Sequence, residues 1–176
     1  MKLVIAIVLL CLLGAPAQAQ DQQQQINAAF ATAVDSFERA LPGLSSQTMG
    51  VDVAAYRDAL TLLRFESKFW GTHVGVDLAN LPAGHAACGR YAAFVRIPPH
   101  DGRVRLALCP QFFTPGADEL RVLTILHEMV HVVAGPDECR AMAFAASVEQ
   151  LATGTHTPVD AYWQANGCAR NAFPLP

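Results

Sequence analysis

The chain has 176 residues, of which 52% are hydrophobic and 15% are charged, and its formal net charge at pH 7 is −3. This length and composition are typical of a single globular domain. The chain contains no run of basic residues and no interleaving of basic with aromatic residues, which argues against nucleic acid and anionic membrane surfaces as partners.

The first 19 residues have the three parts of a secretory signal peptide. Lys2 gives a short basic start, residues 3–13 are apolar, and Ala17-Gln18-Ala19 is a cleavage motif of small residues. The apolar part is too short to span a membrane. We therefore expect cleavage after Ala19 and an exported, soluble mature chain of residues 20–176, in the periplasm or fully secreted. Because Lys2 is the only charged residue removed, the formal charge changes from −3 to −4.

Four cysteines remain once Cys11 has left with the signal peptide, and an even number in an exported chain predicts two disulfides. No C-x-x-C spacing, which would favour cysteine ligands to a metal, is present. Counting alone allows three connectivities. Cys88 and Cys109 flank a predicted hairpin, and Cys139 and Cys168 flank a predicted helical tail. We therefore favour the pairs Cys88–Cys109 and Cys139–Cys168.

Ahead of these cysteines, the sequence predicts two helices and an irregular connection. Apolar residues recur at helical spacing from Ile26 to Phe37, and Pro42-Gly43 ends the pattern. Whether this first helix is an integral element or a removable pro-segment stays open. A second helix is expected over Val53–Phe65. Residues 71–89 are rich in glycine and polar residues, so we expect an irregular connection or a lid there.

A β-hairpin is predicted next. Tyr91–Ile97 and Val104–Leu108 are rich in β-forming residues, and residues 98–102 (P-P-H-D-G) between them have the chemistry of a turn. One strand of this hairpin is expected to run along a substrate cleft and to offer its edge to an extended peptide.

The motif H-E-x-x-H follows, formed by His127, Glu128 and His131 in the stretch Val122–Gly135. Residues four apart lie on one face of a helix, so both imidazoles can bind one metal ion. Zn²⁺ favours imidazole nitrogen, and catalytic zinc sites keep one position open for water. Glu128 is placed to take a proton from that water as the general base. All other residues of the stretch are uncharged and nearly all are apolar, so this trio would be costly to bury without partners.

A catalytic zinc site needs a third protein ligand, and the turn after the helix suggests where it lies. Gly135-Pro136 ends the helix, and Asp137 can cap a second one. If the second helix returns antiparallel, Glu138 lies beside the metal. Asp137 is the alternative ligand.

These residues resemble the aspzincin group of zinc metallopeptidases, which includes deuterolysins and lysine-specific metallo-endopeptidases. The resemblance covers roughly residues 88–146: a hairpin ending in Cys109, then the H-E-x-x-H helix, then Gly135-Pro136-Asp137-Glu138 where the group has G-T-x-D. It implies a zincin-like α+β domain, mostly helical with a small hairpin ahead of the metal helix, and it implies Glu138 as the third ligand. The helix after Glu138 also resembles the glutamate-bearing helix of gluzincin-like peptidases, with the same implication.

The chain departs from the aspzincin pattern after the third ligand. The group has a tyrosine three residues on, thought to stabilise the oxyanion, where this chain has Ala141. Tyr162, Tyr91 and His156 are the candidate replacements. Tyr162 lies in a predicted short helix, Val159–Asn166, which a Cys139–Cys168 bridge would hold near the ligand helix.

The sequence therefore predicts a monomeric exported enzyme with one Zn²⁺ per chain that hydrolyses peptide bonds in protein or peptide substrates. Two alternatives stay open. A zinc-binding module that has lost catalysis is favoured by the missing tyrosine but opposed by the intact Glu128. A metal-dependent amidase acting on cell-wall peptides is compatible with the small size and the signal peptide.

Overall fold

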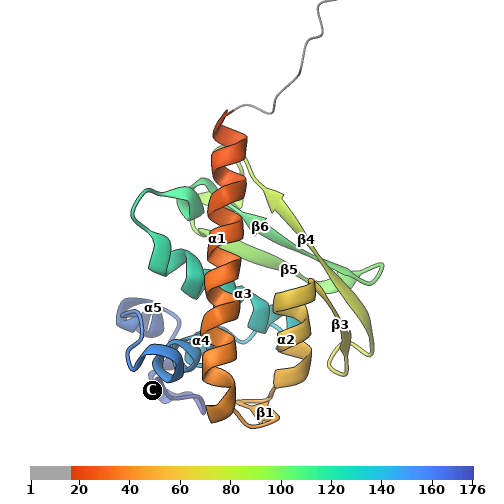
Figure 1. Ribbon diagram of the computed structural model, residues 1–176, viewed down its shortest axis with the longest axis vertical. Helices are drawn as coiled ribbons and strands as arrows, with labels where there is room; N and C mark the ends of the chain where they lie inside the picture. The colour runs from red at the N-terminus through yellow and green to blue at the C-terminus, as the bar shows by residue number, and fades with distance from the viewer. Residues whose placement is uncertain (1–16) are drawn as a thin grey trace, which may run out of the picture.

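The computed structural model describes residues 17–176, and within this range the protein has an α+β fold, as predicted (Figure 1). The helices are α1 (Ala17–Ala40), α2 (Val53–Leu62), α3 (Asp118–Ala134), α4 (Glu138–Thr153) and α5 (Asp160–Ala165). The strands are β1 (Gln47–Thr48), β2 (Val51–Asp52), β3 (Arg64–Ser67), β4 (Thr72–Asn80), β5 (Ala93–His100) and β6 (Arg103–Leu108). The predicted signal peptide lies outside the described residues, except that its last three residues belong to α1, so the cleavage after Ala19 stays a prediction.

Helix α3 is the central element of the fold. It contacts α1, α2 and α4, and it also packs against β5 of the sheet. Figure 1 shows α1 crossing the whole molecule beside the other helices. The buried face of α1 includes Ile26, Ala29, Ala33 and Phe37, which follow one another three or four residues apart, the spacing of one helical face. Because this face belongs to the common core, α1 is an integral helix of the described structure.

The larger sheet has the strand order β3-β4-β6-β5, with β4 and β6 parallel and the other neighbours antiparallel. Strands β5 and β6 form the predicted hairpin. Its turn is shorter than expected, because β5 continues through Pro98 and Pro99 and only Asp101-Gly102 connects the strands. Both turn residues have positive φ, 50° and 68°, as a two-residue hairpin turn requires. Prolines are tolerated in β5 because it is an edge strand with a register shift at this point.

The prediction of an irregular connection over residues 71–89 is wrong for its first half, which forms β4. The alternation of Val74 and Val76 with exposed or half-buried neighbours places one face of this strand in the core. Gly75 lies between them, and the Arg103 guanidinium occupies the space beside it, with Nη1 2.9 Å from the position of an added Cβ. The predicted second helix also ends earlier than expected, since Leu63 adopts a left-handed conformation (φ 52°) and the chain turns into β3.

Two disulfides are present, Cys88–Cys109 and Cys139–Cys168, with the pairing that the sequence favoured. The first joins a 3-10 turn (Ala86–Gly89) to the end of β6. The second joins the first turn of α4 to the 3-10 turn after α5 (Cys168–Arg170). In the part of the chain that the structure describes, no helix combines the length and the apolar character needed to cross a bilayer.

An aromatic cluster fixes α3 against the other helices. Tyr56 of α2 packs between Phe37 of α1 and Phe144 of α4, with ring centroids 5.0 and 4.8 Å away. Its buried hydroxyl donates a hydrogen bond of 2.8 Å to the carbonyl oxygen of Leu126 in α3. Tyr56 therefore ties three helices to the residue that immediately precedes the H-E-x-x-H motif.

We predict that Tyr56→Phe lowers the free energy of unfolding by about 1 kcal/mol, because it removes this buried hydrogen bond and keeps the ring packing. Urea-induced unfolding of the wild type and the variant measures the difference. Tyr91→Phe is the control: its side chain is exposed, so its effect should stay within about 0.5 kcal/mol. Equal effects of the two substitutions would show that the Tyr56 hydroxyl does not support α3.

Candidate metal centre

The residues of the H-E-x-x-H motif are all buried on α3. His127 and His131 lie one turn apart, with ring centroids at 4.7 Å and their Nε2 atoms at 3.0 Å. His131 Nδ1 lies 2.9 Å from the carbonyl oxygen of Gly135. Because a carbonyl can only accept, Nδ1 carries the proton in the neutral ring, and the Nε2 lone pair points toward His127.

The turn after α3 brings a carboxylate to the two imidazoles. Gly135 has φ 85° and ψ −167°, a conformation that glycine adopts without strain, and α4 begins three residues later. Glu138 Oε2 then lies 3.2 Å from His127 Nε2 and 3.3 Å from His131 Nε2. His127, His131 and Glu138 thus form a group that could hold a metal ion, and it is the set of residues predicted as ligands.

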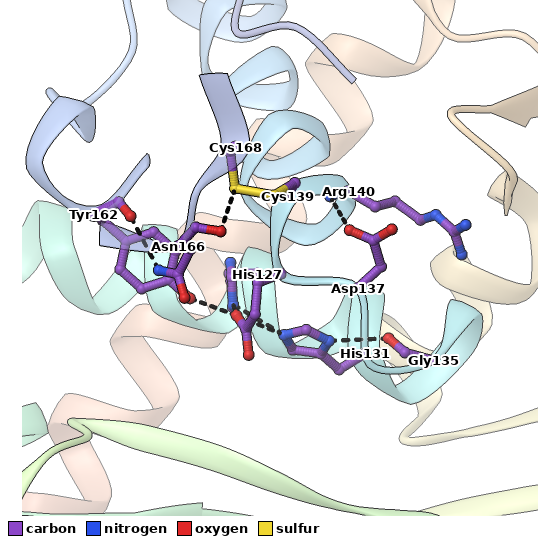
Figure 2. A network of polar contacts seen from close by, with 10 residues as sticks. His127, His131, Gly135, Asp137, Cys139, Arg140, Tyr162, Asn166 and Cys168 are labelled. Carbon is purple, nitrogen blue, oxygen red and sulfur yellow. Dashed lines mark hydrogen bonds and ion pairs between the residues drawn. A yellow bond between two sulfur atoms is a disulfide. The ribbon is translucent and has the colours of Figure 1, made fainter. Parts of the chain in front are cut away.

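The alternative ligand Asp137 has a different position. Its Oδ1 accepts a hydrogen bond of 2.9 Å from the backbone N–H of Arg140, so this side chain is the N-cap of α4 (Figure 2). Asp137 is not a member of the metal-binding group. The structure therefore gives the two neighbouring acids separate roles, one at the site and one at the start of the helix.

The turn between β3 and β4 supports the end of α3, which sequence reasoning did not foresee. Pro136 has no N–H, so the carbonyl of Val132 lacks its usual helical donor. The Trp70 indole N–H replaces this donor and makes a hydrogen bond of 2.7 Å to the carbonyl oxygen of Val132. The neighbouring Phe69 ring lies against Gly135, where an added Cβ would be 2.6 Å from its edge. Both aromatics therefore hold the segment whose carbonyl orients His131.

Tyr162 is the candidate oxyanion donor that the structure brings to the site. Its hydroxyl donates a hydrogen bond to Glu138 Oε2, and its ring centroid lies 5.7 Å from that of His127. Figure 2 shows Tyr162 beside the two histidines, with the Cys139–Cys168 disulfide next to them. Helix α5, which carries Tyr162, is followed directly by Cys168, so the disulfide ties this segment to the first turn of α4.

The other two candidate donors make no hydrogen bond to the His127, His131 and Glu138 side chains among the described residues. Tyr91 is exposed and lines the same cleft as the motif, without a hydrogen bond to the metal-binding group among the described residues. His156 lies beside Gln150, with its Nδ1 3.4 Å from the amide oxygen, and does not line the cleft. Ala141, which stands where aspzincins have their tyrosine, is fully buried in the core.

The surroundings of the site keep the Glu138 carboxylate charged and make the Glu128 carboxylate easier to protonate. Burial by itself would raise the pKa of Glu138, but hydrogen bonds from His127, His131 and Tyr162 outweigh it and hold this pKa well below its ordinary value. Glu128 is different: burial raises its pKa, and the nearby histidines and the Val95 N–H offset this only in part. Burial and the bond to Glu138 also raise the pKa of Tyr162, so its hydroxyl stays protonated.

One buried polar atom of the motif has no protein partner. His127 Nδ1 is buried and makes no hydrogen bond to any described residue, whereas the corresponding atom of His131 is bonded to Gly135. Buried polar atoms are rarely left unpaired. The polar contacts of the His127 ring are therefore concentrated at Nε2, the atom that faces His131 and Glu138.

The site opens into a cleft of about 650 Å³. One wall consists of residues 90–95 and Ile97, which include part of β5. The floor is the face of α3 from Leu120 to His131, and the other wall is formed by Met142, Pro158, Val159, Ala161 and Tyr162. Glu128 and the three metal-binding residues all line this cleft. A molecule bound there would lie against the candidate general base and the metal-binding group together.

Comparisons of the chain with protein-family models, with curated proteins and with solved structures find no match. The resemblance to aspzincins therefore rests on the residues and motifs of the chain itself.

We predict that Glu138→Ala removes most of the bound metal after loading with Zn²⁺, because it deletes one of the three converging donor atoms. Asp137→Ala should keep the metal, since it removes only a helix cap, at a cost of about 1 kcal/mol in stability. Elemental analysis of the dialysed variants measures zinc per chain. Equal zinc loss in both variants would contradict the assignment of Glu138.

Proposed function

We propose that this chain is an exported, zinc-dependent metallo-endopeptidase. The observation that carries the proposal is the convergence of His127 Nε2, His131 Nε2 and Glu138 Oε2 beside Glu128 at the floor of a cleft. No single residue of this set is unusual. Their combination provides three ligands, a general base and room for a substrate in one place.

The donor set fits zinc. A tetrahedral site with bonds of ~2.0–2.1 Å to nitrogen and oxygen has edges of about 3.3–3.4 Å. The three donor atoms are 3.0, 3.2 and 3.3 Å apart, close to these values. Three protein ligands are the number that catalytic zinc sites use, whereas structural sites use four. Cysteine ligands are not available near the site, because Cys139 and Cys168 are joined in a disulfide.

Glu128 acts as the general base in the proposed reaction. His127, His131 and Glu138 would hold the zinc ion, which would supply a bound water of lowered pKa and a Lewis acid for the substrate carbonyl. Burial moves the pKa of Glu128 up toward neutral pH. Such a shift suits a group that accepts a proton and then releases it. Glu128 takes the proton from the attacking water and passes it to the leaving amine.

Strand β5 supports a peptide as the substrate. The carbonyl of Ala92 accepts a hydrogen bond of 2.8 Å from Cys109 N–H. In this register, the backbone N–H and C=O groups of the even-numbered residues of β5 point toward β6. The backbone groups of Ala93, Val95 and Ile97 then point toward the cleft, because the direction alternates along a strand. An extended peptide can pair with this edge. This row of unpaired backbone groups is short, because Pro98 and Pro99 have no N–H group.

Export is part of the proposal because the two disulfides are typical of chains that fold in oxidising compartments. The predicted signal peptide agrees with this. In the sequence, Cys88 precedes the cleft-lining residues of β5, and Cys168 follows α5, which carries Tyr162.

We predict that Glu128→Gln keeps the fold and the zinc but reduces casein hydrolysis by roughly 100-fold or more, because the general base is lost. The control is Glu119→Gln, an exposed acid at the start of the same helix, which should retain full activity. Hydrolysis is measured with and without a chelator, on casein and on peptidoglycan fragments. Undiminished hydrolysis by Glu128→Gln would refute the assigned base, and cleavage of peptidoglycan alone would favour an amidase.

Tyr162 is proposed as the oxyanion donor, because its protonated hydroxyl lies at the metal-binding group and faces the cleft. We predict that Tyr162→Phe lowers kcat by about 10²–10³ while KM changes little. Steady-state kinetics normalised to bound zinc test this. If Tyr162 only orients Glu138, the variant will lose zinc affinity and each zinc-loaded molecule will keep its kcat.

A further inference from the structure

The charge of the cleft is unevenly distributed among its lining residues. Apart from the metal-binding group and Glu128, the only charged side chain among the described lining residues is the cation Arg90. Glu138 is already engaged by His127, His131 and Tyr162. Apart from Glu128, the described lining residues therefore offer no free carboxylate with which to neutralise a basic side chain of a substrate.

The N-terminal half of α3 gives the cleft an apolar floor. The lining residues of this floor are Leu120, Leu123 and Thr124. Leu123 and Thr124 lie three and four residues after Leu120, on the helix face that continues to His127. At a rise of 1.5 Å per residue, Leu120 lies ~10 Å from His127 along the helix axis, and Leu123 lies ~6 Å away. Residues of an extended chain are spaced by ~3.3 Å. This floor therefore lies within two or three residues of a peptide bond held at the metal centre.

Leu120 differs from Leu123 in being solvent-exposed. Its exposed fraction is 54%, while Leu123 is buried in the core. An exposed leucine that faces a cleft gains free energy when an apolar group covers it, and a polar or charged group without a partner there loses its hydration. Leu120 is thus placed to distinguish between substrate side chains.

We propose, building on the proposed peptidase function, that the cleft selects peptides with a large apolar side chain two or three residues from the scissile bond and that Leu120 determines this specificity. Lysine and arginine side chains are disfavoured, because Arg90 repels them and Glu128, the free acid among the described lining residues, lies ~12 Å from Leu120 along the helix axis. This preference differs from that of the lysine-specific members of the group that the sequence resembles.

The test uses the full chain and a set of peptides that differ at one position near the cleavable bond, carrying Leu, Phe, Lys or Glu there. The wild type should cleave the Leu and Phe peptides with a kcat/KM at least tenfold above that of the Lys peptide. Leu120→Asp should reduce this ratio at least tenfold. The substitution favours folding, since position 120 lies in the first turn of α3, where a negative charge stabilises the helix.

Leu62→Asp is the matched control, because Leu62 is 56% exposed, lies at the end of α2 and does not line the cleft. It should leave the ratio unchanged. Leu120→Ala is a milder second variant and should lower the ratio by several fold. Cleavage without an apolar preference, or a preference that Leu120→Asp leaves intact, would overturn the inference and leave the proposed peptidase function standing.

A failure of the proposed function has a different signature. If no peptide is hydrolysed, binding of the same fluorescently labelled peptides to the zinc-loaded chain is measured by anisotropy. The inference then requires at least tenfold tighter binding of the Leu and Phe peptides than of the Lys peptide, lost in Leu120→Asp. Equal binding of all four peptides would overturn it.

Discussion

Three donor atoms that all carry lone pairs meet within 3.3 Å of one another at the end of α3, and the surrounding structure is arranged to hold them there. Such a convergence inside a largely apolar helix pair is unfavourable unless protons or a cation compensate it. The chain positions the atoms with a local device, the Gly135-Pro136 turn, which sets α4 against α3 so that Glu138 faces both histidines. A shift of this turn would move the third donor away from the other two.

Side chains from distant parts of the chain stabilise the helix that carries the motif by binding its carbonyl groups. The Tyr56 hydroxyl binds the carbonyl of Leu126, the Trp70 indole binds that of Val132, and Arg140 binds that of Ala134 at 2.8 Å. The first precedes the motif, and the other two follow it. The helices and the β3–β4 turn that supply these groups therefore fix α3 at both sides of the metal-binding residues, which favours a preorganised site.

The predictable parts of this molecule depend on local patterns. The H-E-x-x-H spacing placed two donors on one helical face, and the short turn before Glu138 left little freedom for the third. The hairpin and the disulfide pairs followed from turn chemistry and cysteine positions. Strand β4 was missed because the glycines and polar residues of the stretch indicated a loop, although Val74, Val76 and Leu78 alternate with Gly75 and Asp77 as in a half-buried strand. The role of Trp70 was missed because a contact across 62 residues has no local signature.

The open edge of β5 has a consequence for how copies of this protein behave toward one another. Any extended chain can pair with an unpaired sheet edge, including an edge strand of a second molecule, and long exposed edges promote association into larger sheets. Here the cleft walls restrict access to the edge, and two prolines end its row of donors after Ile97. Arg96, exposed in the same strand, adds a charge that discourages stacking of like strands. These features favour pairing of the edge with a single flexible strand over pairing with a folded sheet.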